Sequence, residues 1–343
     1  MPLGKNNHQI IDIHTHIYPE QYLNLLQTRK EIPLVIDHGA QREFIIFPEE
    51  FGPDGVGGRM IGPEYWTLAD KITFMDRSGI TQSIVSLGNP WMDAFSSASG
   101  EKAARMVNQS LAGLRSQSKG RVVAMGVLPS TSIDAVLEEL HFIHEHPDLV
   151  GVISGPQVLG LPFDHPDLHP LWRELQQFGL PLFVHPREGV GTDQLQGYRH
   201  TLPVGLAFPF ESTVAMARLV FGGVLEQYPA LKIIAAHGGG VIPYLAGRLD
   251  AAWRSDQEVQ QRLSQAPSEY LKRLFMDALV YYEPALLALR AFVGDDHLMF
   301  GTDHPFSVAD PQANLNNITQ VVGDLGQQEM ILSNVARQLF NLV

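Results

Sequence analysis

Short apolar runs recur along the chain, separated by longer stretches in which apolar and polar positions alternate with a helical period. The runs are rich in valine, isoleucine and leucine, as buried strands are. We expect strands at residues 9–13, 82–87, 122–128, 150–153, 182–184, 232–236, 275–280 and 297–300. That gives eight strands over the whole chain.

The stretches between the runs predict amphipathic helices. In residues 67–78 and 132–144 the apolar side chains recur every three or four positions, which places them on one helical face. Thr67 and Ser132 stand where a side-chain oxygen can cap the first turn. Strands that alternate with helices are typical of parallel βαβ units.

Eight such units with nearly continuous apolar strands favour a closed (β/α)8 TIM barrel over an open sheet. We therefore expect one domain over residues 1–343, with an insertion after the first strand-helix unit. That insertion, residues 31–66, is rich in proline and glycine, and residues 187–203 are similarly irregular. Both are predicted to form lids or walls of an active site, although the first could equally be a surface insertion.

Composition excludes several classes of function. The chain has 24 Lys and Arg against 37 Asp and Glu, and its formal net charge of −13 repels the phosphate backbone of nucleic acids. Its apolar runs are far shorter than the roughly 20 residues of a membrane span, and residues 1–9 lack the apolar stretch of a secretory signal. We expect a cytoplasmic protein that binds neither nucleic acid nor membrane.

The chain contains no cysteine, which excludes disulfides, thiolate catalysis and thiolate metal sites. Two histidines follow the first predicted strand. Strand alternation directs His14 and His16 to the same side, where two imidazoles can meet one ion. Such pairs also occur on ordinary polar surfaces, so the prediction depends on further residues at the same end of the barrel.

Three more strands are followed by residues of this kind. His185 follows the strand at 182–184, His237 opens a run of three glycines, and Asp303 lies in GTDHPF after the last strand. All of them stand at the carboxyl ends of predicted strands, the end at which barrel enzymes assemble their active sites. The sequence therefore predicts one metal centre, with the ligands His14, His16, His185 and Asp303.

Three imidazoles and one carboxylate suit Zn²⁺ and leave a position for water or substrate, although Mn²⁺ or Fe²⁺ could use the same ligands. The fourth run ends at Ser154 and Gly155 and offers no Lys or Glu to bridge a second ion. One divalent ion is therefore expected. His237 then becomes a candidate acid-base group beside it.

These motifs resemble the amidohydrolase superfamily and, within it, the aminocarboxymuconate-semialdehyde decarboxylase family. The similarity extends over nearly the whole chain and is most specific in residues 208–249, in DIHTHIYP near the start and in LMFGTDHPF near the end. The resemblance implies the same four metal ligands, with His237 contacting metal-bound water or substrate.

Within this family, residues 32–35, 86–91, 200–203 and 303–306 are most similar to isoorotate (5-carboxyuracil) decarboxylases. This similarity implies that Asn89 and Arg248 contact the pyrimidine or its carboxylate and that Phe306 packs on the ring. Arg248 in such enzymes reaches the site of a neighbouring subunit, which implies a homodimer or a larger homo-oligomer. Residues 187–189, Arg-Glu-Gly, depart from the family pattern of a second His and a Tyr.

We therefore expect a metal-dependent, non-oxidative decarboxylase of a small planar cyclic or enol-type carboxylic acid, with 5-carboxyuracil as one candidate. The ion would bind the leaving carboxylate and a ring oxygen, while Asp303 delivers a proton and His237 assists. That role requires a raised pKa for Asp303, which an apolar pocket walled by Trp91 and Phe306 would supply. Both aromatic residues could instead belong to the core.

Two alternatives use the same ligands. In a hydrolase of a lactone or amide, the ion would lower the pKa of a bound water and Asp303 would take its proton. A catalytically silent metal-binding or scaffold protein is the other alternative. Carbon dioxide release separates the decarboxylase from the hydrolase, whereas Asp303→Asn would alter only the stability of a silent protein.

Overall fold

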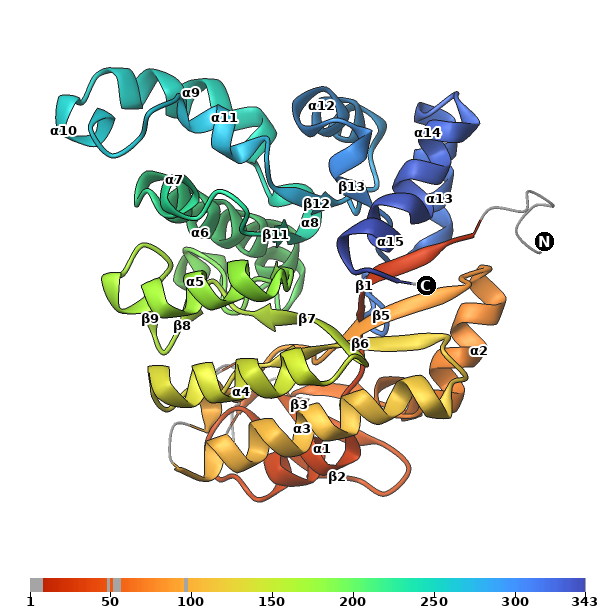
Figure 1. Ribbon diagram of the computed structural model, residues 1–343. Coiled ribbons are helices and arrows are strands. Elements are labelled where there is room, and N and C mark those ends of the chain that lie inside the picture. The colour runs from red at the N-terminus through yellow and green to blue at the C-terminus, as the bar shows by residue number, and fades with distance from the viewer. Residues whose placement is uncertain (1–8, 48–49, 52–56, 96–97, 343) are drawn as a thin grey trace.

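Eight parallel strands form a barrel whose outer face is covered by helices (Figure 1). The computed structural model describes residues 9–47, 50–51, 57–95 and 98–342. Within these residues the barrel strands follow one another in chain order: β1 (Ile11–His16), β5 (Gln82–Ser86), β6 (Val122–Val127), β7 (Leu149–Ser154), β10 (Leu182–Val184), β11 (Ile233–Ala235), β12 (Phe275–Asp277) and β13 (Leu298–Met299).

Backbone hydrogen bonds between the first strand and the segment after β13 close the barrel. The Ile13 N–H donates to the Phe300 carbonyl at 3.0 Å, and the Asp303 N–H donates to the His14 carbonyl at 2.7 Å. Each predicted run overlaps one of the eight strands, so the (β/α)8 prediction is confirmed. The first strand begins and ends later than predicted, because its pairing with β5 continues to His16.

The helices include both segments predicted from periodicity. Thr67 and Ser132 cap them, with each side-chain oxygen accepting the N–H three residues later. The α-helices are α1 (Glu20–Gln27), α2 (Leu68–Ser78), α3 (Ala98–Gln117), α4 (Ile133–Glu145), α5 (His169–Phe178), α6 (Phe208–Phe221), α7 (Val224–Gln227), α8 (Ala236–Gly239), α9 (Ile242–Arg254), α10 (Gln257–Gln260), α11 (Pro267–Leu271), α12 (Glu283–Val293), α13 (Pro311–Val321), α14 (Leu325–Glu329) and α15 (Val335–Leu339).

Single turns complete the connections. They are the 3₁₀ turns η2 (Pro63–Tyr65), η3 (Met92–Ala94), η4 (Pro166–Leu168), η5 (Thr192–Leu195) and η7 (Asp295–His297), and the π-helical turns η6 (Pro203–Ala207) and η8 (Met330–Asn334). A small antiparallel pair, β8 (Gln157–Val158) and β9 (Leu161–Pro162), follows β7.

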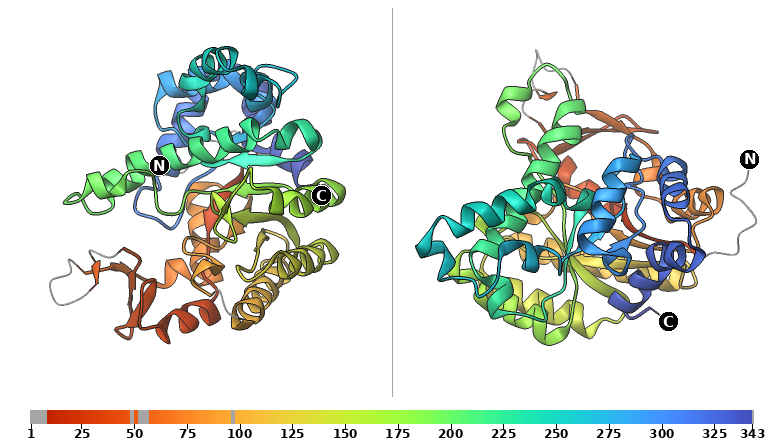
Figure 2. Two further views of the ribbon diagram at one scale, coloured as in Figure 1. Left: turned by 90° about the vertical axis from the view of Figure 1, so that its left-hand side faces the viewer. Right: turned by 90° about the horizontal axis from the view of Figure 1, so that it is seen from above.

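The predicted insertion contains an antiparallel sheet rather than only irregular loop. Its strands are β2 (Leu34–Asp37), β3 (Arg42–Ile45) and β4 (Arg59–Ile61), while residues 48–49 and 52–56 lie outside the described part of the chain. Phe44 is buried and packs edge-on against Tyr18, which follows β1. The sheet and the start of η6 project from the same side of the barrel (Figure 2).

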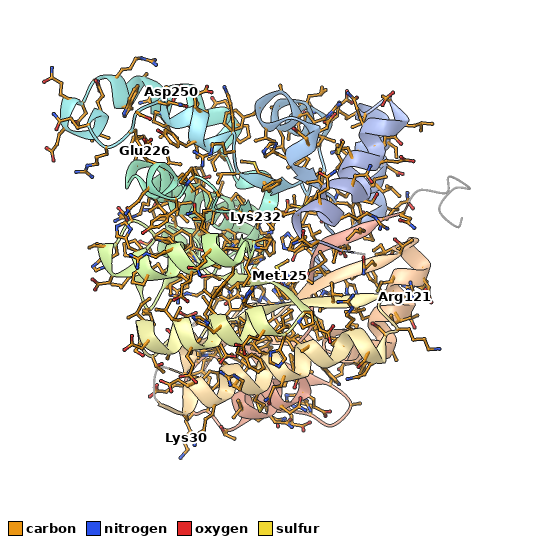
Figure 3. The ribbon with its side chains drawn as sticks, viewed as in Figure 1. Lys30, Arg121, Met125, Glu226, Lys232 and Asp250 are labelled. Atoms are coloured by element: carbon orange, nitrogen blue, oxygen red, sulfur yellow. The ribbon has the colours of Figure 1, made fainter. Side chains whose placement is uncertain are left out.

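The barrel strands supply most of the interior. Met125 on β6 is fully buried near the centre of the molecule, whereas Lys30 and Arg121 extend at its periphery (Figure 3). Burial of one such large apolar side chain contributes about 1.5–3 kcal/mol of transfer free energy. A continuous apolar interior therefore supports the loops at the carboxyl ends of the strands.

One helical segment, residues 203–221, has the length and apolar composition of a membrane span, and 44% of it is buried inside the protein. Buried core helices of globular proteins have the same length and composition. In the structure its Glu211 carboxylate accepts three backbone N–H groups of the 187–189 loop, and Arg218 pairs with Asp164. These contacts bind the segment to the barrel.

Candidate metal centre

The four predicted ligands meet at the carboxyl end of the barrel. His14 and His16 project from β1, His185 directly follows β10, and Asp303 lies after β13. All four are buried, and one donor atom from each lies within 4.8 Å of the others. The loop around Asp303 packs closely on β1. A Cβ at Gly301 would lie only 2.7 Å from that of His14, so this close approach requires glycine.

The donor atoms that converge have no hydrogen-bond partners of their own. Nε2 of His14, His16 and His185 and Oδ1 of Asp303 are buried and unpartnered within the described residues. Oδ1 lies 3.4 Å from Nε2 of His14 and 3.3 Å from that of His16. Ligands about 2.1 Å from a common tetrahedral ion lie about 3.4 Å apart. The donor set and its spacing therefore fit one divalent cation.

The opposite nitrogen of each imidazole has a partner that fixes the ring. Nδ1 of His14 lies 2.7 Å from Asp277, that of His16 lies 3.0 Å from the Ser86 hydroxyl, and that of His185 lies 2.8 Å from the Pro186 carbonyl. Such contacts orient metal-binding histidines and set which nitrogen carries the proton. They direct all three Nε2 atoms toward the centre.

Asp277, at the end of β12, was not predicted as a site residue. Its carboxylate accepts the backbone N–H groups of His237 at 2.8 Å and Gly238 at 2.9 Å in addition to its contact with His14. His237 adopts a left-handed conformation with φ of 55°, and the glycines after it continue the turn. This turn places Nε2 of His237 3.8 Å from Oδ2 of Asp303, outside the four ligands but beside them.

A cavity of about 300 Å³ opens beside these residues. Predicted site residues that line it are Asn89, His185, His237, Asp303 and Phe306. Lining residues that were not predicted individually as site residues include Arg59 from β4 and His200. The guanidinium of Arg59 lies 5.1 Å from the centre of the Phe306 ring. The cavity therefore combines an aromatic wall with a cationic group, and a volume of this order suits a small ring-shaped ligand.

Comparison with known proteins agrees with this geometry. The amidohydrolase family matches residues 11–342. The chain belongs to the amidohydrolase family. It is 29% identical over 306 residues to 2-amino-3-carboxymuconate-6-semialdehyde decarboxylase of Dictyostelium discoideum, a match covering 88% of this chain and 82% of the relative.

Two further comparisons point the same way. The chain is 28% identical to gamma-resorcylate decarboxylase of Rhizobium sp. (strain MTP-10005), covering 79% of this chain and 86% of that protein. The crystal structure of Metarhizium anisopliae IDCase (isoorotate decarboxylase) in apo form superposes with a TM-score of 0.91 at 31% identity, covering 98% of each chain. The predicted family and fold are thus confirmed.

Trp91 and Arg248 are not among the residues that line this cavity. Trp91 is buried, its indole N–H donates to the Leu87 carbonyl at 2.9 Å, and its ring centre lies 5.8 Å from that of His185. Its role as a wall of the substrate pocket stays a prediction. Arg248 is exposed on α9, so its predicted contact with another subunit's site stays a prediction.

The pKa of Asp303 is shifted in the direction opposite to the predicted one. Burial raises the pKa of this carboxyl group, but contacts with His14, His16 and His237 outweigh it and hold the pKa well below the usual range. Burial lowers the pKa of His14, yet Asp277 and Asp303 together raise it to about 10. These two shifts favour an ionised Asp303 next to a protonated His14, whereas a raised pKa was predicted for Asp303.

A buried lysine supports the loop that carries Asp303. Lys71, on α2, is fully buried, and its Nζ lies 2.7 Å from both the Thr15 hydroxyl and Nδ1 of His304. Asp12 is also fully buried and accepts the Thr302 hydroxyl at 2.7 Å. Burial lowers the pKa of Lys71 and raises that of Asp12, while their mutual attraction opposes both shifts. These contacts tie α2 and β1 to residues 302–304.

Proposed function

We propose that this protein is a metal-dependent, non-oxidative decarboxylase of a planar cyclic or enol-type carboxylic acid. The observation that carries the proposal is the convergence of three imidazoles and one carboxylate on one point beside a cavity of about 300 Å³. The relatives from Dictyostelium and Rhizobium are both named as decarboxylases of unsaturated acids, which supports the same reaction class.

The cavity suits a flat acid. Phe306 supplies an aromatic wall close to His16, with the ring centres 5.2 Å apart, and Arg59 supplies a positive charge next to it. A carboxylate and a conjugated ring complement these two groups. We propose 5-carboxyuracil as the first candidate because of the similarity to Metarhizium IDCase, and hydroxybenzoic acids as related candidates.

The metal would be held by His14, His16, His185 and Asp303, and we propose Zn²⁺, with Mn²⁺ as the alternative. Nitrogen-rich ligands of this kind bind Zn²⁺ well, whereas the single carboxylate also accommodates Mn²⁺. When bound, the ion supplies Lewis-acid stabilisation of the negative charge that develops as the carboxylate leaves. Burial of the four ligands keeps water from competing for these interactions.

The product requires a proton at the ring carbon that loses its carboxylate. Asp303 and His237 both line the cavity and lie 3.8 Å apart. Because the pKa of Asp303 is held low, Asp303 must first gain a proton before it can donate one. We propose that solvent supplies this proton, that His237 shares it with Asp303, and that Asp303 carries it to the ring carbon as carbon dioxide leaves.

We further propose a homodimer in which Arg248 of each chain reaches the partner's cavity. Support comes from the exposure of Arg248 and of nearby Tyr244 on α9, the latter 88% exposed. Analytical ultracentrifugation tests the assembly. Mixing Arg248→Ala with Asp303→Asn chains tests the sharing of sites, since a mixed dimer regains one complete site.

We also propose a cytoplasmic location, which cell fractionation tests.

The deciding experiment measures carbon dioxide release from carboxylated pyrimidines, hydroxybenzoates and muconate semialdehydes, together with metal analysis of the purified protein. Release from one class at about one ion per chain supports the proposal. The ionised Asp303 also suits a base that activates water, so lactones and amides are assayed in parallel. Hydrolysis of lactones or amides without release of carbon dioxide from any acid would contradict the decarboxylase proposal and support a hydrolase.

A further inference from the structure

The loop between β13 and α13 carries both a predicted metal ligand and part of the cavity wall. Asp303 lies near its start, and residues 306–308 line the cavity. The base of the loop is fixed, because the side-chain amide of Asn314 donates to the Gly301 carbonyl at 2.9 Å. The loop tip, residues 306–309, is held by the Tyr281 hydroxyl, which donates to the Val308 carbonyl at 3.1 Å. Within the described residues, no other side chain outside the loop donates a hydrogen bond to the backbone of the loop tip.

The two sides of the loop tip are held in different ways. The Phe306 ring packs edge-on against Tyr65, with the ring centres 5.9 Å apart, and the guanidinium of Arg59 lies over it. Val308 is 42% exposed, so less of its side chain packs against the protein. The position of Val308 therefore depends more on the hydrogen bond to its carbonyl than on side-chain packing.

The backbone of Tyr281 is itself fixed. Its φ of 51° is in the left-handed region, which bulky side chains rarely adopt. The chain before it is tightly bonded, because the Val280 N–H donates to the Ala278 carbonyl at 3.0 Å and the Leu279 N–H donates to the Asp277 carboxylate at 3.2 Å. Such a conformation persists only where the surrounding structure fixes it. The hydroxyl of Tyr281 is therefore held in place relative to the metal centre through Asp277.

The Tyr281 hydroxyl is a neutral donor at physiological pH. Burial raises its pKa, the negative charge of Asp303 raises the pKa further, and a hydrogen bond with the backbone of Asp310 opposes both shifts. A protonated phenol donates one hydrogen bond and also accepts. Tyr281 therefore donates to the Val308 carbonyl and accepts from the Asp310 backbone, which holds the end of the loop tip at two points.

We infer that Tyr281 is a positioning residue that sets the width of the cavity at Val308 and thereby limits the size of the ring that the enzyme accepts. The inference rests on the proposed function and adds a determinant of specificity to it. Tyr281 is not among the residues that line the cavity, so it acts through the loop backbone. A wall that is ordered before the acid arrives also lowers the entropic cost of binding a ring that fits.

The test compares zinc-loaded wild-type protein with Tyr281→Phe, which removes the hydroxyl and keeps the ring. Because a wall contacts substrate and transition state alike, KM for the accepted acid should rise about tenfold while kcat stays nearly unchanged. The same acid with an added methyl or ethyl group on its ring should lose less, so the preference for the parent acid should fall about tenfold. Tyr282→Phe, at the neighbouring residue with 66% exposure, is the matched control and should keep wild-type values. An unchanged size preference in Tyr281→Phe would overturn the inference and leave the decarboxylase intact.

Hydrogen exchange of the zinc-loaded protein, without any acid, separates positioning of the loop from loss of the fold. Exchange of backbone amides in residues 306–310 should be about tenfold faster in Tyr281→Phe, while residues 11–16 of β1 keep wild-type rates. Wild-type rates in residues 306–310, or equally faster exchange in both segments, would contradict the inference.

If no acid releases carbon dioxide, the proposed function fails, and calorimetric binding of the same parent and alkylated acids then judges the inference. A preference for the smaller acid that is strong in the wild-type protein and reduced in Tyr281→Phe supports it. The same preference in both proteins contradicts it.

Discussion

Nδ1 of His14 lies 2.7 Å from Oδ2 of Asp277, although the two residues are 263 positions apart in the chain. The same carboxylate holds the backbone of His237 and Gly238, so one side chain orients a predicted metal ligand and a predicted acid-base residue together. Asp277 therefore connects the orientation of a metal ligand to the placement of His237 beside the centre.

Replacing Asp277 with Asn should weaken metal binding and catalysis together. Loss of such an outer contact typically costs about 10–100-fold in metal affinity or activity. Competition with a chromophoric chelator measures the affinity, and the rate is then taken at saturating metal. Asp76→Asn, at an exposed ion pair with Arg121, is the matched control. If Asp277→Asn bound the metal with wild-type affinity, His14 would not need the Asp277 carboxylate as a partner.

Metal uptake should release a proton near neutral pH. The pKa of His14 is raised to about 10 in the ion-free centre, while burial lowers the pKa of His16 to about 4 and that of His185 well below its usual value. Only His14 must then lose a proton, so about one proton is released per ion and affinity rises about tenfold per pH unit below pH 10.

Calorimetry in buffers of different ionisation enthalpy counts these protons. His14→Ala removes the titrating group and serves as the comparison, at the cost of weaker binding. Release of no proton between about pH 6 and 9 would show that His14 is already neutral in the ion-free protein.

Lys71→Met should lower the free energy of unfolding by about 3 kcal/mol, because it leaves buried polar and charged partners uncompensated. These partners are the Thr15 hydroxyl, Nδ1 of His304 and the nearby Asp12 carboxylate. Urea unfolding of the ion-free protein measures the change. Lys272→Met, at a half-exposed pair with Glu269, should change it by less than about 1 kcal/mol. Equal effects of the two variants would contradict a structural role for the Lys71 charge.

Glu50 should stabilise the protein in a pH-dependent way. Burial raises its pKa, but its contacts with His200 and with the N–H groups of Phe47 and Ile46 lower the pKa below the ordinary 4.5. A lowered carboxyl pKa contributes stability above pH 4.5, and this contribution is lost as pH falls through the folded value.

Glu50→Gln removes this titration. The stability difference between wild type and variant, measured by urea unfolding, should therefore be largest above pH 4.5 and shrink as the pH falls through the lowered folded pKa. A difference that stays constant with pH would mean that Glu50 acts through its hydrogen bonds alone.

The sequence predicted the barrel and the four converging donors because both depend on strong, repeated signals. Apolar runs mark the strands, and polar residues immediately after a strand are brought to one end by the parallel topology. The Asp303 loop shows the limit of this reasoning. The position of Asp303 was predictable. The pKa of its carboxyl group depends on its distances to three histidines, and only the fold supplies these distances.

Asp277 and Lys71 were missed for different reasons. Asp277 lies within a predicted apolar strand, and a carboxylate in such a run signals a buried partner. Lys71 lies three residues after Leu68 and four before Met75, so helical periodicity places it on the apolar face, but the sequence does not show the partners Thr15 and His304 that it meets there. The hydrogen bond from the Trp91 indole to the Leu87 carbonyl could not be predicted, because its acceptor is a backbone atom, which carries no sequence signal.

The backbone hydrogen bonds between β1 and the segment after β13 have a consequence for biosynthesis. His14 and His16 leave the ribosome long before Asp303, which the backbone bonds align with β1. A nascent chain that has not yet reached Asp303 therefore carries an incomplete set of donors. We expect tight binding of the cation only in chains that include Asp303, so a product truncated before it should not sequester the ion.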